Sequence, residues 1–509
     1  MTTTGPAPAL PGRPISPWLD EPERPTRAPL ERDLEVEVAV LGAGIIGLTT
    51  AFELQRRGTS VAVLEGRQVA GGVTGNTTAK LSSLHGLSYD SIRSTRGEQA
   101  AAAYARANQW GIERVAELAR ELAIDCDLRR KPNFTYTEDP ERLGGLESEV
   151  DAALAVGLPA SFTVDTDLPF DVAGAVRFDD QAEFQPVAYL LGLAAALDGG
   201  AQTVYERSRA VDVSGTTVTT ETGRRVSARR VVVATQLPFL DRGLFFARAR
   251  VERSYGLSVR IRGPIPQGMY LQAERPGRSL RSLRWRGEEL LLVGGESHEA
   301  GHAEAADKFE ALARYAHERF DVTGFEHRWS AHDFMPEDGL PYIGRLWPLS
   351  DRVLTATGMR KWGLAMGTAA ARMLADEITG QPNEWAAVFD PRRLPPLSSA
   401  PKLLKHNAEA GVFFFGDRAR RGHGTADLAP GEGRVIADGL GQRAVHRDDA
   451  GVLRAVSARC SHLGCIVRWN AAERTWDCPC HGSRFEATGA VLTGPATQPL
   501  EPREATEDG

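Results

Sequence analysis

The first clear pattern of apolar and polar positions starts at Leu34. Valines alternate there with charged residues, a glycine-rich turn follows, and apolar residues then recur at helical spacing as far as Arg57. A second short apolar run, Ser60–Leu64, comes soon after. Alternation at every second residue predicts a strand and recurrence at about 3.6 residues predicts a helix, so this segment predicts a β–α–β unit.

Further along the chain, helical and strand patterns continue to alternate. Helices are predicted at Glu98–Ala123, Pro186–Ala196, Ala303–Phe320 and Gly363–Thr379. Strands are predicted at Arg230–Ala234, Val251–Arg262, Glu289–Gly294 and Arg352–Thr357. The alternation predicts a mixed α/β domain over residues 34–393.

Segments of a different character flank this domain. Residues 1–33 are rich in proline and predict a tail that is extended over the surface or disordered, with Trp18 as an anchor. Residues 394–429 also hold prolines and predict a linker with one short helix, Leu403–Phe415. Residues 430–509 are rich in strand and turn patterns and predict a small all-β domain, of a size at which a metal cluster helps folding.

Composition excludes several classes of function. Apolar residues make up 42% and charged residues 25%, which is typical of a globular protein. The net charge of −7 gives no general attraction to nucleic acid or to anionic membranes. Neither a run of about 18 apolar residues nor a basic-then-apolar N-terminal segment is found. We therefore expect a cytoplasmic protein without a membrane span and without nucleic acid as a partner.

A glycine motif follows the first predicted strand. Gly42, Gly44 and Gly47 have the spacing G-x-G-x-x-G, which permits a tight turn, a close approach to a pyrophosphate and close packing of helix on strand. Glu65 follows Gly47 by 18 residues, at the end of the next strand, where a carboxylate receives ribose hydroxyls. A glycine-rich turn beside a capping acid is the alternative, but the place between strand and helix favours a dinucleotide site.

Four further segments resemble the D-amino-acid oxidase superfamily of flavoenzymes. They are Gly71–Thr74, Val232–Thr235, Asp338–Gly344 and Leu354–Leu364. The resemblance covers about residues 34–392 and implies FAD, held without a covalent link, together with an antiparallel substrate sheet. The FAD contacts that it implies, with the glycine motif, are Gly42, Gly44, Gly47, Glu65, Gly72, Thr74, Val211, Ala234, Gly358, Trp362 and Gly363. A helix that starts at Gly363 would also direct its positive end toward the ligand.

Enzymes of this superfamily take a hydride from the carbon beside an amine nitrogen. No strong general base is needed when the amine binds neutral, so we expect no catalytic triad. The resemblance makes Tyr255, Arg284, His332 and Lys361 the candidate catalytic residues, with His298 and His302 as further candidates. For each of these residues the alternative is a purely structural role, such as a hydroxyl on the surface of a strand, a solvated charge or a hydrogen bond that caps a turn.

Four of the five cysteines fall within 21 residues near the C-terminus. Cys460–Cys465 reads CSHLGC and Cys478–Ser483 reads CPCHGS, so two loops offer cysteine and histidine at the spacing C-x-H and C-x-x-H. Two thiolates on one iron and two imidazoles on the other form a Rieske [2Fe–2S] centre. A structural zinc site is the alternative, but a zinc site does not require the residues that surround the cysteines and histidines in these two motifs.

The two loops resemble those of Rieske proteins in cytochrome bc complexes. The resemblance implies the cluster ligands Cys460, His462, Cys478 and His481 and a disulfide between Cys465 and Cys480. It also places the two histidines on the outer, more exposed iron, which makes that edge the expected exit for electrons. Phe485 stands where those proteins carry a tyrosine that donates to a cluster ligand, so a lower reduction potential is expected.

Together these features predict a fusion of an amine-oxidising FAD domain with a Rieske domain. Its expected partners are a small amine or amino acid and an external electron acceptor. An oxygen-using oxidase with an auxiliary cluster and a non-catalytic electron-transfer or redox-sensing flavoprotein are the alternatives. The intact segment Gly358–Gly363 argues against the last of them.

Overall fold

The computed structural model describes residues 10–21, 23–200, 202–396, 399–419, 424–439 and 441–505. Its nucleotide-type sheet has the strand order β16 (Tyr342–Trp347), β17 (Ser350–Thr357), β10 (Arg225–Val233), β1 (Leu34–Leu41), β2 (Val61–Leu64) and β7 (Val204–Tyr205). β9 (Thr217–Thr220) pairs with β10, and β8 (Ala210–Ser214) pairs with β9. β17, β10, β1, β2 and β7 run parallel, whereas β16 is antiparallel to β17.

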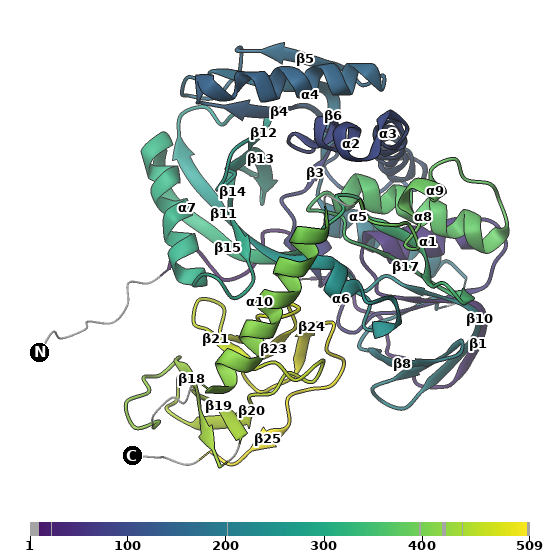
Figure 1. Cartoon of the computed structure of the whole chain (residues 1–509), viewed down its shortest axis with the longest axis vertical. Coiled ribbons are helices and arrows are strands. Elements are labelled where there is room, and N and C mark those ends of the chain that lie inside the picture. The colour runs from purple at the N-terminus through teal and green to yellow at the C-terminus, as the bar shows by residue number, and fades with distance from the viewer. Residues whose placement is uncertain are drawn as a thin grey trace, which may run out of the picture.

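A second, nine-stranded sheet lies beside the first (Figure 1). Its order is β15 (Asp321–Pro336), β11 (Ala249–Arg262), β14 (Glu288–Glu299), β13 (Ser279–Trp285), β12 (Met269–Gln272), β4 (Arg129–Thr137), β6 (Gly174–Glu183) and β3 (Lys80–Leu81), with β5 (Ala160–Thr163) beside β6. Its pairings are antiparallel except for β12 with β4. This is the antiparallel sheet that the sequence resemblance implied.

Helices cover both sheets. They are α1 (Ile45–Gln55), α2 (Ser88–Arg96), α3 (Glu98–Glu121), α4 (Leu143–Ala155), α5 (Pro186–Leu197), α6 (Phe245–Arg248), α7 (Ala305–Arg319), α8 (Gly363–Thr379) and α9 (Ala386–Phe389), with the short 3₁₀ helices η1 (Val73–Asn76), η2 (Pro140–Arg142) and η3 (Asp241–Gly243). The helices predicted at α3, α5, α7 and α8 occur within three residues of the expected bounds. The sequence patterns missed α2 and α4.

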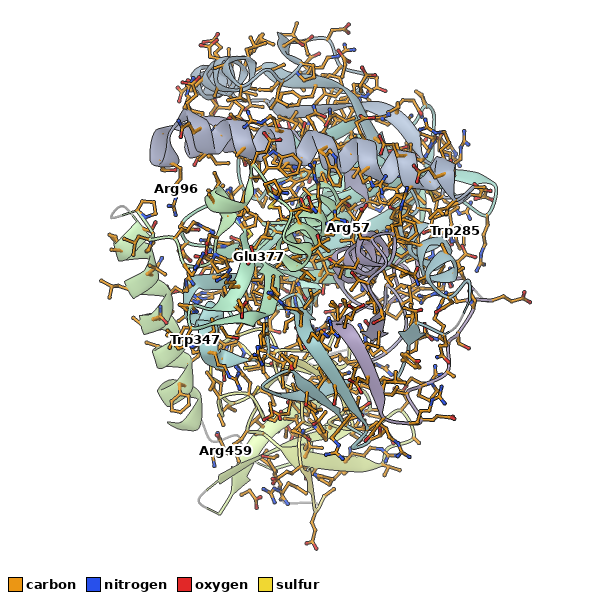
Figure 2. All side chains as sticks on the ribbon, turned by 90° about the vertical axis from the view of Figure 1, so that its right-hand side faces the viewer. Arg57, Arg96, Trp285, Trp347, Glu377 and Arg459 are labelled. Carbon is orange, nitrogen blue, oxygen red and sulfur yellow. A yellow bond between two sulfur atoms is a disulfide. The ribbon has the colours of Figure 1, made fainter. Side chains whose placement is uncertain are left out.

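The C-terminal part consists of two small antiparallel sheets (Figure 1). One holds β18 (Gly433–Asp438), β19 (Gly441–Arg447), β20 (Leu453–Ser457) and β25 (Pro502–Arg503). The other holds β21 (Arg468–Asn470), β22 (Thr475–Asp477), β23 (Arg484–Glu486) and β24 (Val491–Thr493). α10 (Ala400–Ala419) leads to them along the outside of the molecule and is longer than the predicted helix Leu403–Phe415 (Figures 1 and 2).

The proline-rich N-terminal segment is extended over the larger part of the chain. Arg13 forms a β-bridge with His327, and Trp18 is buried with its Nε1 donating to the Thr77 carbonyl at 2.7 Å. The disordered alternative therefore does not hold for residues 10–21, while residues 1–9 lie outside the described part of the chain. The boundaries at 33, 393 and 429 stay predictions.

Small residues bring α8 close to its neighbours. A Cβ on Gly111 of α3 would lie 2.1 Å from the Ala365 carbonyl oxygen, and one on Gly367 would lie 2.9 Å from Ile46 of α1. These contacts pack α8 tightly between α3 and α1. They fix the start of α8, which faces the cavity described below.

Gly111→Ala tests this close packing. Because the added methyl would collide with backbone, we expect a loss of roughly 1–3 kcal/mol of stability, seen as a lower midpoint of thermal unfolding. Gly144→Ala, on the exposed start of α4 where a Cβ meets nothing within 4 Å, is the matched control and should be neutral or slightly stabilising. Equal midpoints for both variants would contradict the packing argument.

Candidate functional site

A cavity of about 700 Å³ lies between the two sheets. Its wall includes Leu41, Leu64, Ala234 and Thr357, which stand at or just beyond the carboxyl ends of four parallel strands. Ligands of open α/β sheets bind in this position. The volume lies within the range of about 300–1,000 Å³ that is usual for small-molecule sites.

The glycine motif shapes one end of this cavity. Gly42 has φ +106°, and a Cβ there would lie 2.6 Å from the Ala234 carbonyl oxygen. A Cβ on Gly47 would lie 1.9 Å from the Gly42 carbonyl oxygen, so only glycine lets α1 pack onto the turn. Gly44 lines the cavity, and the amide of Ile45 donates to Thr74 Oγ1 at 3.3 Å. The turn thus leaves a cradle that suits a pyrophosphate.

Glu65 closes the end of β2 beside this turn. One of its carboxylate oxygens accepts from the Ala43 amide at 2.8 Å and the other accepts from the Arg67 amide at 2.8 Å. These bonds hold the carboxylate at the cavity wall, where the sequence predicts ribose hydroxyls.

Nine of the eleven predicted FAD contacts line the cavity. They are Gly42, Gly44, Glu65, Gly72, Thr74, Ala234, Gly358, Trp362 and Gly363. Gly47 acts through packing instead. Val211 does not line the cavity, whereas Ala210 does, because successive residues of β8 point to opposite faces of the sheet.

The predicted substrate-side residues divide into two groups. Tyr255, His332 and Lys361 line the cavity, and burial raises the pKa of Tyr255, which keeps its hydroxyl protonated. Arg284 does not line the cavity: its exposed guanidinium pairs with Asp127 at 3.3 Å, so the structure does not bring Arg284 together with the other three candidates.

The two further histidine candidates also lie off the cavity wall. His298 stacks on Tyr255 and shares a hydrogen bond with its hydroxyl at 2.9 Å. His302 is exposed and lies 3.9 Å from Glu299. His85 is buried, and both of its ring nitrogens are engaged, by Tyr104 and by the Ser82 carbonyl.

Lys361 belongs to a compact polar group that the sequence did not reveal. Its Nζ lies 2.9 Å from a carboxylate oxygen of Glu252 and donates to Ser297 Oγ at 2.6 Å. Burial by itself would raise the pKa of Glu252, but Lys361, Arg250 and Arg275 outweigh it and lower that pKa to about 2. Glu252 is therefore ionised at neutral pH and faces the cavity beside the Lys361 ammonium.

His332 connects this cavity to the C-terminal part of the chain. Its Nδ1 donates to the Gly482 carbonyl at 3.2 Å, and its Nε2 accepts from Arg253 Nε at 2.9 Å. Burial, and then the charges of Arg253 and Arg484, hold the pKa of His332 well below its usual value. The ring is therefore neutral, with its proton fixed on Nδ1.

An interdomain ion network, formed by Arg253, Glu473, Asp477 and Arg484, surrounds this contact. The buried Arg253 guanidinium lies 2.5 Å from Asp477 and 3.5 Å from Glu473, and Arg484 bonds the same two carboxylates. Burial alone would raise the pKa of Asp477, but Arg253 and Arg484 hold it below its usual range. The network explains why charged residues interrupt the apolar pattern of β11.

The C-terminal part also supplies a wall of the cavity. Glu473, Arg484 and residues 492–497 line it, and Glu473 accepts a hydrogen bond from Ser330 of β15 at 2.8 Å. Arg209 donates to the Val491 carbonyl at 2.8 Å and fixes this wall beside the Glu65 end. The larger cavity is therefore completed by both parts of the chain.

The four predicted cluster ligands lie together on two neighbouring loops. Cys460 and Cys478 are buried free thiols, and a hydrogen bond from Cys478 lowers the pKa of Cys460 to about 7. The rings of His462 and His481 lie 5.1 Å apart, and His462 Nδ1 is buried with no hydrogen-bond partner in the described part of the chain. Two thiols and an unpartnered imidazole nitrogen suit a [2Fe–2S] centre with mixed ligands.

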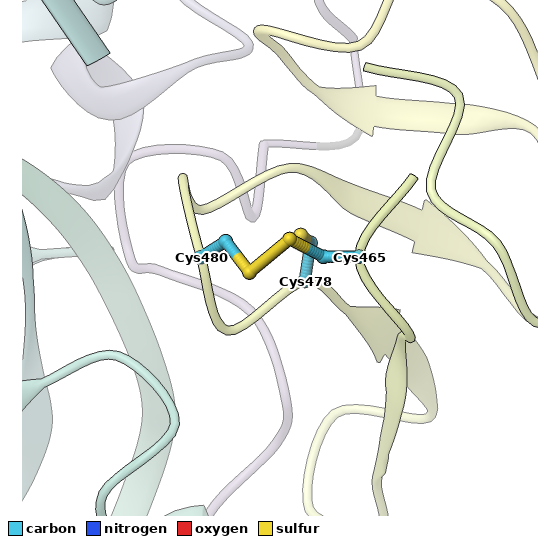
Figure 3. A group of neighbouring side chains, drawn as sticks. All are labelled: Cys465, Cys478 and Cys480. Carbon is cyan, nitrogen blue, oxygen red and sulfur yellow. A yellow bond between two sulfur atoms is a disulfide. The ribbon is translucent and has the colours of Figure 1, made fainter. Parts of the chain in front are cut away.

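A disulfide ties the two loops together. Cys465 and Cys480 are bonded, and their sulfurs lie within 4.8 Å of Cys478 Sγ (Figure 3). Ser483 hydrogen-bonds Cys460 and accepts from the Ala496 amide at 3.0 Å. Phe485 is fully buried in the core that contains the ligand cysteines.

The histidine edge, meaning His462 and His481, does not face solvent as expected. The side chain of His462 is 5% exposed and His481 is 8% exposed. Phe246 of α6 packs edge-on against both rings, with centroids 5.8 and 5.1 Å away, and Asp241 of η3 contacts His462. The expected exposure of this edge is wrong, because the larger part of the chain covers it.

Comparison with known families agrees with this geometry. Residues 37–377, more than half of the chain, match the family described as FAD dependent oxidoreductase. The chain belongs to this family. Residues 423–503 match the Rieske [2Fe-2S] domain. The predicted fold class is confirmed, as are FAD and a [2Fe–2S] cluster as cofactors of this flavoenzyme.

Individual relatives match either nearly the whole chain or its larger part. A protein named as a Rieske 2Fe-2S iron-sulfur protein, YhfW of Bacillus subtilis (strain 168), is 32% identical over 490 residues, which cover 95% of this chain and 96% of the relative. Glycine oxidase from Geobacillus kaustophilus (TM-score 0.59, 21% identity) covers 71% of this chain and 99% of its own. L-proline dehydrogenase from P. horikoshii (TM-score 0.58, 18% identity) covers 71% and 98%. At such identities the solved structures show the fold of this oxidoreductase.

None of the helices within the described residues is long and apolar enough to cross a membrane.

Glu65→Ala tests the nucleotide end of the cavity. A carboxylate that receives ribose hydroxyls contributes roughly 1.5–3 kcal/mol, so the FAD dissociation constant should rise about tenfold or more. Glu35→Ala, an exposed position on the same sheet, is the control and should leave FAD affinity unchanged. Equal FAD affinity in the two variants would remove Glu65 from the site.

Proposed function

We propose that this chain oxidises the carbon–nitrogen bond of a small amine or amino acid and that the electrons leave through its [2Fe–2S] cluster to an external acceptor. FAD, when bound, accepts the hydride, and the cluster carries one electron at a time. The observation that carries the proposal is His332, which lines the FAD cavity and hydrogen-bonds the residue directly after the predicted ligand His481.

The cavity residues fit an amine that binds in its neutral form. Tyr255 stays protonated, His332 has both nitrogens engaged, and Lys361 is paired with Glu252, so none of the three is poised as a strong base. Their proposed role is to orient the substrate and exclude water. The names of the two solved relatives, a glycine oxidase and an L-proline dehydrogenase, support an amino acid as substrate.

The chain itself provides the connection between the two cofactors. Gly482 stands between the predicted ligand His481 and Ser483, and its carbonyl oxygen accepts a hydrogen bond from His332 Nδ1. Phe246, which belongs to the FAD-binding part, covers the other face of the histidine edge. These contacts support electron transfer within one chain over delivery by a separate carrier.

Anaerobic flavin bleaching against a panel of amines and amino acids tests the proposed function. One substrate class should bleach the flavin and then reduce the cluster, seen as a Rieske-type EPR signal. Turnover should be faster with an artificial acceptor than with oxygen. No bleaching by any amine would contradict the substrate class, and rapid turnover with oxygen would favour an oxidase with an auxiliary cluster.

His481→Ala tests the order of electron transfer. Loss of an iron ligand should abolish the EPR signal, while the same substrate still bleaches the flavin because the FAD cavity keeps its own wall residues. Multiple-turnover reduction of the artificial acceptor should fall at least tenfold. His317→Ala, on the exposed face of α7, is the matched control. A variant that holds FAD but no longer bleaches would show that electrons do not reach the flavin first.

A further inference from the structure

We propose that Asp241, in the FAD-binding part of the chain, is a positioning residue for the cluster, where it holds His462 and lowers the reduction potential of the [2Fe–2S] centre. The inference rests on the Rieske cluster alone. It does not depend on amine oxidation, and its test needs no substrate.

The two ring nitrogens of His462 have different surroundings. Nε2 lies 2.9 Å from Asp241 Oδ1, and since a carboxylate only accepts, Nε2 carries the proton and donates it. Nδ1 is buried and has no partner among the described residues. Asp241 therefore fixes the tautomer that leaves Nδ1 free for iron, which is how an outer carboxylate orients a ligating histidine.

The second histidine of the edge lacks such a carboxylate. His481 packs against Phe246 and against the ring of His462, and its side chain has no hydrogen bond within the described part of the chain. The two imidazoles are thus inequivalent. Asp241 hydrogen-bonds His462, although its charge also reaches His481, and it does so from the 3₁₀ helix η3, which lies outside the Rieske domain in the sequence.

The expected direction follows from charge and basicity. A carboxylate on Nε2 makes the imidazole a stronger donor to iron, and it adds negative charge beside a centre that gains an electron. Both effects favour the oxidised cluster. Hydrogen bonds, net charge and solvent exposure are the properties that set the potentials of iron–sulfur clusters.

The consequence is that the FAD-binding part sets the potential of its own electron partner. Phe246 and Asp241 together cover the histidine edge, which the resemblance to bc-complex Rieske proteins implied would be exposed in this chain. Removing the carboxylate should change the cluster without touching the FAD cavity, because Asp241 does not line it.

The test is a mediated redox titration of the cluster in the full-length protein at fixed pH. Asp241→Asn and Asp241→Ala remove the charge, while Asp241→Glu keeps it. Glu409→Gln is the matched control, since Glu409 lines a small cavity beside Pro479 and Cys480 and has no bond to either histidine. Iron content and the EPR line shape of the reduced cluster are measured for every variant.

We expect the one-electron reduction equilibrium of Asp241→Asn and Asp241→Ala to shift about tenfold toward the reduced cluster, which is ~59 mV. Asp241→Glu should stay near the wild type, as should Glu409→Gln. An unchanged or lower potential in both neutral variants, with iron content intact, would overturn the proposal. Loss of the cluster from both would also overturn it, because the inferred role is tuning and not assembly.

Discussion

The buried guanidinium of Arg253 joins the two parts of this oxidoreductase. It lies between Asp477 and Glu473 of the Rieske domain and donates to His332 of the cavity wall. Removing one partner of a buried pair typically costs about 3–5 kcal/mol, so such a group fixes the position of whatever surrounds it. Here it fixes a cofactor cavity on one side and the loop that carries Cys478 on the other.

This constraint accounts for the unusual surroundings of the cluster. With Asp477 held by Arg253, the following residues Cys478–Gly482 lie against β11, β15 and α6. The histidine edge then faces inward, and residues 492–497 close the FAD cavity. One interface thus completes the flavin site and buries the histidine edge of the cluster, which makes the two cofactors neighbours within one chain.

Much of this could be predicted from the sequence because the relevant signals are local. The turn Gly42–Gly47 must be glycine-rich for steric reasons, and the cluster loops carry their ligands at fixed spacing. α3, α5, α7 and α8 carry enough apolar residues to be recognised, whereas α2 is short and polar.

What the sequence could not predict depends on contacts between distant residues. Arg253 pairs with Asp477, 224 positions away, and Asp241 meets His462 across 221 positions. The sequence did not distinguish the buried Arg253 from Arg284, whose side chain is exposed. The available signal for Arg253 was a charged residue among the apolar positions of β11. That signal did not indicate that Asp477 is the partner of Arg253.

We propose that electrons pass between flavin and cluster inside one chain. Anaerobic photoreduction of the flavin, followed by cluster reduction in its absorbance bands, tests this without any substrate. The account predicts a first-order rate constant that does not change when the protein is diluted tenfold. A rate that falls in proportion to protein concentration, or a cluster that stays oxidised beside a reduced flavin, would contradict it.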